Sequence, residues 1–205
     1  MEENSVYIDY QAAKPVDPEI LSAMMEYSTK YFGNPSSLHK VGDIATETLE
    51  KSRKIISEYL HADPKEILFT SGATESNNLA ILGYAFRNYR KGKHIIISEV
   101  EHISIHNLAK YLEKNGFTVS KVPVDQFGRV KLKKLKSRIT DETILISVQL
   151  ANYEIGTLQP IKEIAKIAHE HNIALHTDAV AAQGLVDLNV NELEVDLMSL
   201  SSNDF

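Results

Sequence analysis

Residues His94 to Val122, HIIISEVEHISIHNLAKYLEKNGFTVSKV, show the clearest fold signal of the chain. It begins and ends with short apolar runs, HIIIS and FTVSKV, of the kind found in strands that are buried on both faces. A longer amphipathic segment separates the two runs. A strand, a helix and a second strand in this order predict a parallel sheet that is covered by helices.

The same alternation continues before and after this stretch. Amphipathic patterns such as NNLAILGYAFRNYR (77–90) and PIKEIAKIAHEH (160–171) predict helices. Further strands are predicted at EILFT (66–70), TILISVQL (143–150), IALHT (173–177) and DLMSLS (196–201). Nearer the amino terminus, Asp17 and Pro18 are typical of a helix start, and a second helical pattern runs from about Ser37 to Leu60. We therefore predict an α/β fold with a mostly parallel, doubly wound sheet and helices on both faces.

The composition limits the kinds of partner. The chain has 205 residues, a formal net charge of −6 and no cysteine. An acidic protein is a poor match for nucleic-acid phosphates, so we expect a small-molecule ligand. No apolar run reaches the roughly 18 residues that cross a bilayer, and no signal peptide opens the chain, which predicts a cytoplasmic protein without a membrane segment. Without cysteine, these residues offer no disulfide, thiolate ligand or sulfur nucleophile.

Polar residues follow the predicted strands at the points where the strands end. Ligands of open α/β sheets bind outside the carboxyl ends of the strands, so these residues are candidates for a site. Gly72 and Ala73 allow close backbone approach, and Thr74 stands at a helix start whose N–H groups can hold a phosphate. The other candidates are His102, Asn152, Glu154, Asp178, Ser201, Asn203 and Asp204.

Several of these residues also have a structural interpretation. Thr74 and Asp178 can be plain helix caps. A lone histidine such as His102 more often has a structural role, and its i, i+4 pairing with His106 would need a third ligand to hold zinc. The delivery of several polar residues to one edge is what favours a site.

Six segments, taken in this order, resemble the cysteine desulfurases of the iron–sulfur-cluster branch, which belong to the class V group of pyridoxal-phosphate (PLP) enzymes. The segments are VYIDYQAAKPVDPEIL, FGNPSSLHKVGD, DPKEILFTSGATESNNLAI, ANYEIGTLQPI, HTDAVAAQG and VDLMSLSS. The resemblance covers nearly the whole chain but only the first half of the family's pattern. It implies an incomplete large domain of the type I PLP transferases over residues 17–205, preceded by an arm over residues 1–16.

The resemblance also implies a role for each matched residue. The loop of Gly72, Ala73 and Thr74 would hold the cofactor phosphate, with Ser201 helping. His102 would lie over the pyridine ring and assist proton transfer. Asp178 would pair with the pyridinium nitrogen, because a nearby carboxylate keeps that nitrogen protonated and makes the ring an electron sink. Asn152 would reach the ring's hydroxyl side and the substrate.

Two departures from the family pattern concern the same side of the ring. The family carries histidine and the Schiff-base lysine where this chain has Asn203 and Asp204, and a glutamine where it has Ala181, with Gln183 nearby but out of register. A carboxylate cannot form an imine, so we expect PLP to be held non-covalently, with Asp204 at the lysine's catalytic position. The persulfide cysteine and the arginine that grips the substrate carboxylate belong to the second half of the pattern.

These features predict a cysteine desulfurase-like protein of sulfur transfer and iron–sulfur cluster assembly. The family converts L-cysteine to L-alanine and an enzyme persulfide, whereas this chain is expected to supply the PLP bed and to be inactive alone. Its expected partners are L-cysteine, an iron–sulfur scaffold protein, and either a second copy of itself or a companion carboxyl-terminal chain. Two alternatives stay open: a non-catalytic scaffold that keeps the PLP fold, and another class V PLP enzyme such as an aminotransferase.

Overall fold

The computed structural model describes residues 6–10 and 13–202. The chain divides into two compact units, Met1–Leu68 and Phe69–Phe205. Each unit is described by itself. Among the described residues, none of the helices combines the length and the apolar character needed to span a bilayer.

The first unit contains two α-helices, α1 (Pro18–Thr29) and α2 (Lys40–Leu60), and the 3₁₀ helix η1 (Pro64–Glu66). The Asp17 side chain accepts from the Glu19 N–H at 2.8 Å, so the predicted start of α1 is confirmed. Helix α2 begins three residues later than predicted, because the His39 ring caps it by accepting from the Gly42 N–H. No residue of α1 is buried.

The second unit is built on a sheet of five parallel strands in the order β2–β1–β3–β4–β5. The strands are β1 (His94–Ser98), β2 (Thr118–Val122), β3 (Thr143–Ser147), β4 (Ala174–Asp178) and β5 (Leu197–Ser199). Strands β1, β3 and β4 are buried along their whole length, which is why their sequences are apolar without alternation. The predicted runs at these positions are confirmed, although β3 and β5 end before the predicted runs do.

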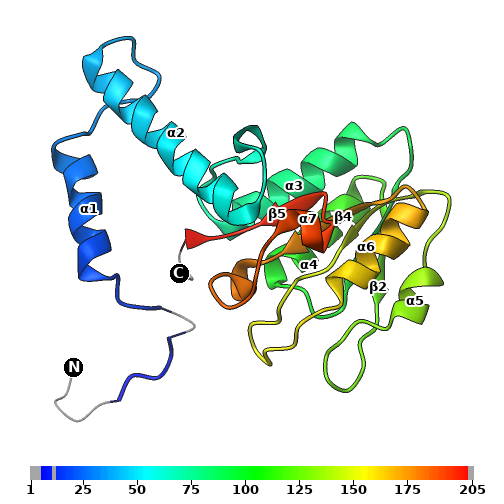
Figure 1. Ribbon diagram of the computed structural model, residues 1–205. Coiled ribbons are helices and arrows are strands. Elements are labelled where there is room, and N and C mark those ends of the chain that lie inside the picture. The colour runs from blue at the N-terminus through cyan, green and yellow to red at the C-terminus, as the bar shows by residue number, and fades with distance from the viewer. Residues whose placement is uncertain (1–5, 11–12, 203–205) are drawn as a thin grey trace. The chain divides into compact units, whose positions relative to one another are not determined.

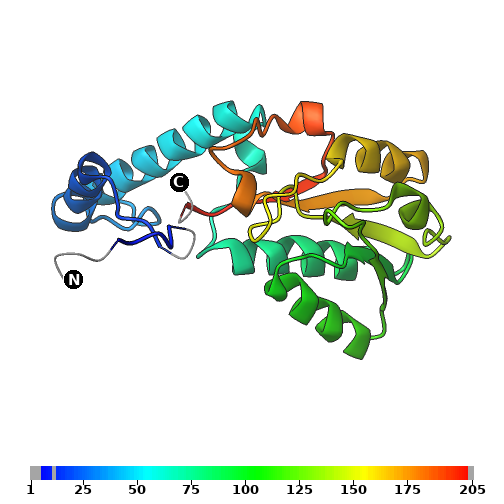
Figure 2. The same cartoon turned by 90° about the horizontal axis from the view of Figure 1, so that it is seen from below.

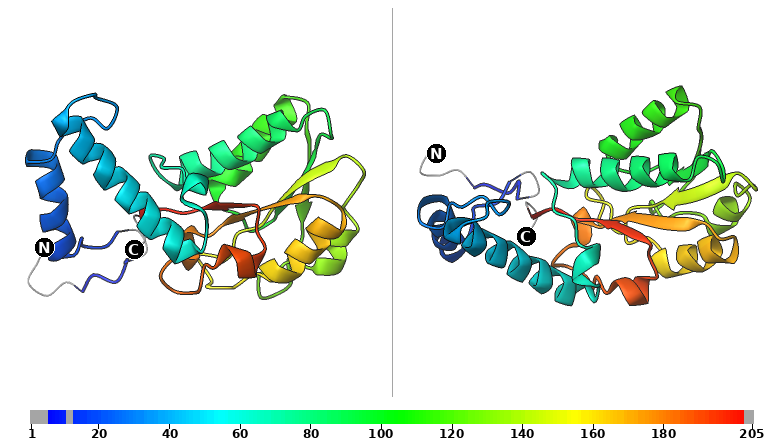
Figure 3. Two further views of the ribbon diagram at one scale, coloured as in Figure 1. Left: turned by 45° about the horizontal axis from the view of Figure 1, so that its top comes forward. Right: turned by 90° about the horizontal axis from the view of Figure 1, so that it is seen from above.

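Helices cover both faces of this sheet (Figures 1, 2 and 3). On one face lie α3 (Ala73–Arg87) and α4 (Ile103–Lys114). On the other face lies α6 (Ile161–Glu170), flanked by α5 (Leu132–Lys136) and α7 (Val190–Leu193). Side chains from α3, α4 and the strands, among them Ile81, Ile105 and Leu145, form a buried apolar cluster. The predicted doubly wound α/β architecture is therefore confirmed.

The prediction of a strand over residues 66–70 is wrong. Residues 67–70 have no regular structure, and Leu68 and Phe69 are 71% and 46% exposed. A strand is stabilised by its hydrogen-bonded neighbour, and none of the strands in the described part of the chain pairs with this segment. Apolar composition alone therefore did not determine the structure of these residues.

Candidate functional site

Because the strands are parallel, their carboxyl ends meet at one edge of the sheet, where α3 and α4 also begin. The chain passes from β1 to β2 on one side and places β3 on the other side of β1. The space between the carboxyl ends of β1 and β3 is thus the topological switch point, where ligands of such folds bind. Most of the candidate residues follow strands at this edge.

A hydrogen-bonded chain joins two of the predicted residues, Asp178 and His102. The Asn77 amide nitrogen donates to Asp178 Oδ2 at 2.8 Å and lies 3.4 Å from Ser104 Oγ. Ser104 Oγ in turn lies 2.7 Å from His102 Nδ1. The second carboxylate oxygen of Asp178 accepts from the Val180 N–H at 3.1 Å. Asp178 and Asn77 are both buried, so these contacts fix the carboxylate away from bulk water.

The surroundings of His102 select one form of its neutral ring. His102 caps α4 by accepting from the Ser104 N–H at its Nδ1 atom. An atom that accepts a backbone N–H cannot carry a proton itself, so the proton of the neutral imidazole is on Nε2. The ring also makes an edge contact with Tyr153, with the ring centres 5.9 Å apart.

Asn152 is buried at the same edge and its side chain is held on both sides. Its Oδ1 accepts from the N–H groups of Glu154 and Ile155, and its amide nitrogen donates to the Val100 carbonyl at 3.2 Å. These contacts form a turn after β3 and connect it to the turn that carries His102. The exposed Glu154 stands beside it in sequence and takes part through its backbone.

The loop before α3 has the backbone that the sequence predicts for an anion cradle. Gly72 has φ of +155° and ψ of −179°, a conformation that is essentially restricted to glycine. Gly72 is also the N-cap of α3 and offers no side-chain cap, while Ala73 and Thr74 open the helix. The Glu75 carboxylate reaches back and accepts from the Ser71 N–H and hydroxyl at 2.6 and 2.5 Å. The Ser71 hydroxyl, followed by its N–H, lowers the pKa of Glu75.

Thr74 stands in the first turn of α3. It lines a hollow of about 320 Å³ between α3 and α4, together with Asn78, Ser104 and Tyr111 among others. Ser104 belongs both to this hollow and to the chain of hydrogen bonds that ends at His102. Of the candidates Thr74, His102, Asn152 and Asp178, Thr74 is the one that lines this hollow, and their grouping around one ligand stays a prediction.

The end of β5 is fixed by a glutamine that the family pattern does not place there. The Gln183 amide nitrogen donates to the Ser201 carbonyl at 2.7 Å, and Gln183 is 3% exposed. Ala181 lies in the 3₁₀ helix η2 (Val180–Ala182). Asn203 and Asp204 lie outside the described residues.

The described residues contain four buried side-chain atoms that have no hydrogen-bond partner: Asn77 Oδ1, Glu101 Oε2, His106 Nδ1 and Gln183 Oε1. All four belong to residues that follow a strand's carboxyl end or stand in the first two turns of α3 or α4. Buried polar atoms are normally paired, so unpaired ones concentrated at one edge fit a polar ligand. Asn77 contacts Asp178 directly, so an unpaired polar atom belongs to a residue beside the carboxylate to which the family resemblance gives the pyridinium nitrogen.

Sequence reasoning missed Asn77, Glu101 and Ser104. Asn77 shares one face of α3 with the buried residues Ile81 and Ala85, at spacings of four residues. A polar residue within an apolar helix stripe is the signal that could have found it. Glu101 and Ser104 flank His102 and carry no such signal, because their partners are distant in sequence or depend on the turn geometry.

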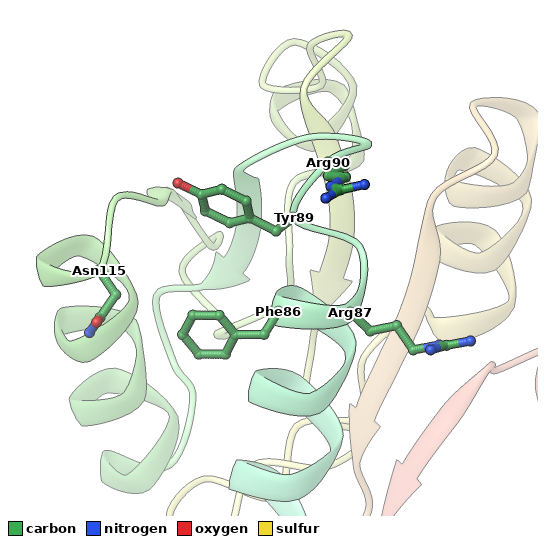
Figure 4. Close-up of a pocket in the computed structure, with 5 residues that line it drawn as sticks. All are labelled: Phe86, Arg87, Tyr89, Arg90 and Asn115. Atoms are coloured by element: carbon green, nitrogen blue, oxygen red, sulfur yellow. The ribbon is translucent and has the colours of Figure 1, made fainter.

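A second hollow, of about 440 Å³, is lined by Phe86, Arg87, Tyr89, Arg90 and Asn115 (Figure 4). These residues stand at or just beyond the carboxyl ends of α3 and α4, and hence at the amino edge of the sheet. Figure 4 shows the Phe86 and Tyr89 rings on the side of Asn115, with Arg87 pointing away. No candidate site residue lines this hollow.

Comparisons with known proteins match the chain along almost its whole length. Residues 6–204 match the Aminotransferase class-V family. Cysteine desulfurase IscS 1 of Archaeoglobus fulgidus is 51% identical over 198 residues, which are 97% of this chain and 52% of the relative. Cysteine desulfurase IscS of Methanosarcina thermophila is 48% identical over 204 residues, which are 100% of this chain and 50% of the relative.

Two solved structures are also similar. A NifS-like protein has a TM-score of 0.94 at 37% identity, over 98% of this chain and 55% of the other. SspA in complex with cysteine has a TM-score of 0.93 at 37% identity, over 98% of this chain and 58% of the other. The chain thus spans about half the length of the curated relatives that it matches.

Proposed function

We propose, on the premise that this chain belongs to the class-V aminotransferase family, that it forms the PLP-binding part of a cysteine desulfurase-like protein of sulfur transfer and iron–sulfur cluster assembly. The observation that carries the proposal is the buried Asp178 carboxylate, fixed by Asn77, whose own Oδ1 atom has no hydrogen-bond partner. Its substrate would be L-cysteine, which the similar SspA structure holds.

Asp178 supplies the negative charge of the proposed site. When bound, PLP contributes an electron sink that stabilises negative charge on the substrate's α carbon. The Asp178 carboxylate would favour the protonated form of the ring nitrogen, since an opposite charge at short range stabilises the charged state. Asn77 and the Val180 N–H hold both carboxylate oxygens, so the charge is in place before the ligand arrives.

His102 holds a proton at Nε2 and is oriented through Nδ1 by Ser104. It would lie against the ring and could donate that proton, which is the role of a general acid or base in this position. A series of hydrogen bonds through Ser104 and Asn77 connects His102 to Asp178. The two residues are therefore oriented by one shared set of hydrogen bonds.

The Gly72–Ala73–Thr74 loop and the start of α3 would hold the phosphate, with Ser201 at the end of the last strand helping. Because no side chain caps α3 at Gly72, the N–H groups of this helix start can donate to a bound acceptor. The helix dipole favours an anion there. The Glu75 carboxylate already takes the Ser71 donors and adds negative charge, which limits the affinity of the loop alone. Asn152 would contact the hydroxyl side of the ring and the substrate.

Asp204 and Ala181 limit what this chain can do by itself. We propose that PLP is held without a covalent bond, that residues 17–205 form one cofactor-binding domain after an arm of residues 1–16, and that turnover requires a second copy or a companion carboxyl-terminal chain. An iron–sulfur scaffold protein would be the sulfur acceptor.

The test is binding of pyridoxine 5′-phosphate to the 205-residue chain, measured by equilibrium dialysis. This compound lacks the aldehyde and so does not react with surface lysines. We expect saturable binding that Asp178→Asn weakens by about tenfold or more, because a buried charge pair is lost. The matched control is Asp141→Asn, at an exposed position away from the site. Equal affinity of wild type and Asp178→Asn would overturn the assignment.

A non-catalytic scaffold is the second candidate, and the residue at position 204 favours it. Asp204 offers no amine, and the 205 residues contain no cysteine. Mixing the chain with a candidate companion chain and assaying L-alanine release from L-cysteine separates the two functions. Alanine formation supports the desulfurase; binding of the cofactor analogue without alanine formation supports the scaffold.

A further inference from the structure

We propose that Glu101 is a positioning residue whose carboxyl ties the turn that carries His102 to the end of β3 and the loop that carries Asn152. Glu101 stands directly before His102 and is 6% exposed. The inference rests on the proposed function for the roles of His102 and Asn152, but the contacts themselves do not depend on it.

One oxygen of Glu101 joins two neighbouring strands. Glu101 Oε1 accepts from the Ser98 hydroxyl at 2.5 Å and from the Gln149 N–H at 2.9 Å. Ser98 ends β1, and Gln149 follows β3 by two residues. Because β1 and β3 are adjacent at the topological switch point, Glu101 closes the gap between their carboxyl ends.

A second pair of hydrogen bonds holds the same turn from its backbone. The Val100 carbonyl accepts from the side-chain amides of Gln149 at 2.6 Å and Asn152 at 3.2 Å. Gln149 therefore contacts the turn twice, through its own N–H and through its amide. Removing Glu101 would release one of the two attachments that set the position of His102 relative to Asn152.

The surroundings of Glu101 favour the neutral carboxyl. The pKa of Glu101 is raised to about 8, chiefly by burial and to a smaller extent by the charge of Asp178 at the end of β4, while the Ser98 and Gln149 donors oppose the rise. Ser98 and Gln149, which contact the carboxyl directly, are uncharged. Its second oxygen, Oε2, is buried without a partner, as expected of a group that does not carry a full charge.

A neutral Glu101 has a consequence for Asp178. Two carboxylates that interact in a buried site cannot both ionise easily, so the proton is retained by one of them. Glu101 takes that proton, which leaves the negative charge on Asp178, where the pyridinium nitrogen would bind. Glu101 thus fixes the position of His102 through hydrogen bonds and favours the negative charge of Asp178 through electrostatics.

The first test is the pH dependence of stability of wild type and Glu101→Gln, with Glu99→Gln as the matched control at an exposed position in the same turn. A glutamine reproduces the shape and hydrogen bonds of a neutral acid. Because the folded-state pKa is raised above the unfolded value of about 4.3, wild type binds the extra proton when folded and loses stability as pH rises from about 4.3 to 8. We expect the unfolding constant of wild type relative to Glu101→Gln to increase by up to about tenfold per pH unit there. A ratio that does not change with pH would overturn the neutral form.

The second test reads the position of His102 directly. Nitrogen-15 shifts of His102 report which ring nitrogen is protonated, and we expect Nε2–H in wild type and Glu101→Gln. Glu101→Ala releases the turn that positions the ring, so the His102 shifts should move and pyridoxine 5′-phosphate should bind more weakly. If Glu101→Ala does not fold, the pH dependence of stability and the His102 nitrogen-15 shifts of Glu101→Gln still test the proposal. Unchanged His102 shifts in a folded Glu101→Ala would contradict the proposal, whereas a wild type that binds no cofactor analogue would contradict only the proposed function.

Discussion

The two edges of the sheet treat buried polar groups differently. At the amino edge, both ring nitrogens of His94 have partners: Nδ1 lies 2.7 Å from the Thr143 hydroxyl, and Nε2 lies 2.9 Å from the Ser120 hydroxyl. At the carboxyl edge, Asn77, Glu101 and Gln183 each keep one polar atom without a partner. His94 is as buried as Asn77, Glu101 and Gln183, so exposure does not explain the difference.

The difference separates polar groups that serve the fold from those that serve a ligand. A fully paired network in a buried sheet stabilises the chain by itself, because every donor and acceptor is satisfied on folding. Unpaired buried polar atoms lower the stability of the fold, so they are expected where they contribute to binding a ligand. Substitutions at the amino edge should therefore affect folding, and those at the carboxyl edge should affect binding.

The largest effect is expected from His94→Ala. This change leaves the Thr143 and Ser120 hydroxyls without their partner and opens a cavity in a buried strand, at a cost of about 3 kcal/mol in the free energy of unfolding. Urea denaturation followed by circular dichroism measures it. Affinity for pyridoxine 5′-phosphate per folded molecule should stay the same, and a loss below about 1 kcal/mol would mean that the paired network is not a stabilising one.

Acid should destabilise the chain through a second paired histidine, His176. Its ring lies between the Ser147 and Ser199 hydroxyls, at 2.9 and 3.0 Å, and burial lowers its pKa to about 3. The unfolded chain binds the proton first as pH falls, so stability present above about pH 6.5 is lost toward pH 3. Between pH 6.5 and 5 we expect a loss of about 2 kcal/mol relative to His176→Gln, which cannot be protonated. Parallel pH curves for the two proteins would exclude this role for His176.

Asn77→Leu should weaken ligand binding at the carboxyl edge with little effect on the stability of the fold. Leucine has a similar size, removes the unpaired Oδ1 atom and deprives Asp178 of one donor. We expect the affinity for pyridoxine 5′-phosphate to fall about tenfold, or ~1.4 kcal/mol, while stability without ligand changes by less than about 1 kcal/mol. Equilibrium dialysis and urea denaturation give the two numbers. The reverse pattern, with lost stability and retained binding, would place Asn77 among the residues of the fold.

The smallest effect is expected from Thr140→Val. The Thr140 hydroxyl reaches His94 and Thr143 only at 3.4 and 3.3 Å, and the residue is exposed. Its backbone N–H still donates to Thr143 after the change. We expect less than about 0.5 kcal/mol in the free energy of unfolding, which makes this variant the control for His94→Ala. A larger loss would extend the essential network beyond the buried residues.

Local pattern was sufficient for much of the fold. The run HIIIS matches β1 residue for residue, and the start of α1 at Asp17 and Pro18 was predicted from capping. These features are readable because burial on both faces and helix capping each act over a few neighbouring residues. The candidate residues His102, Asn152 and Asp178 were found in the same way, from their places at strand ends.

Most of the succession of strands and helices, the family, and the arrival of His102, Asn152 and Asp178 at the carboxyl edge could be read from the sequence. The irregular structure of residues 67–70 and the hydrogen bonds of Asn77, Ser104 and Glu101 could be read from the folded chain alone. The physical reason is separation along the chain. Asn77 and Asp178 are 101 residues apart, and Glu101 and Gln149 are 48 apart, so these hydrogen bonds depend on the packing of elements that no local pattern encodes.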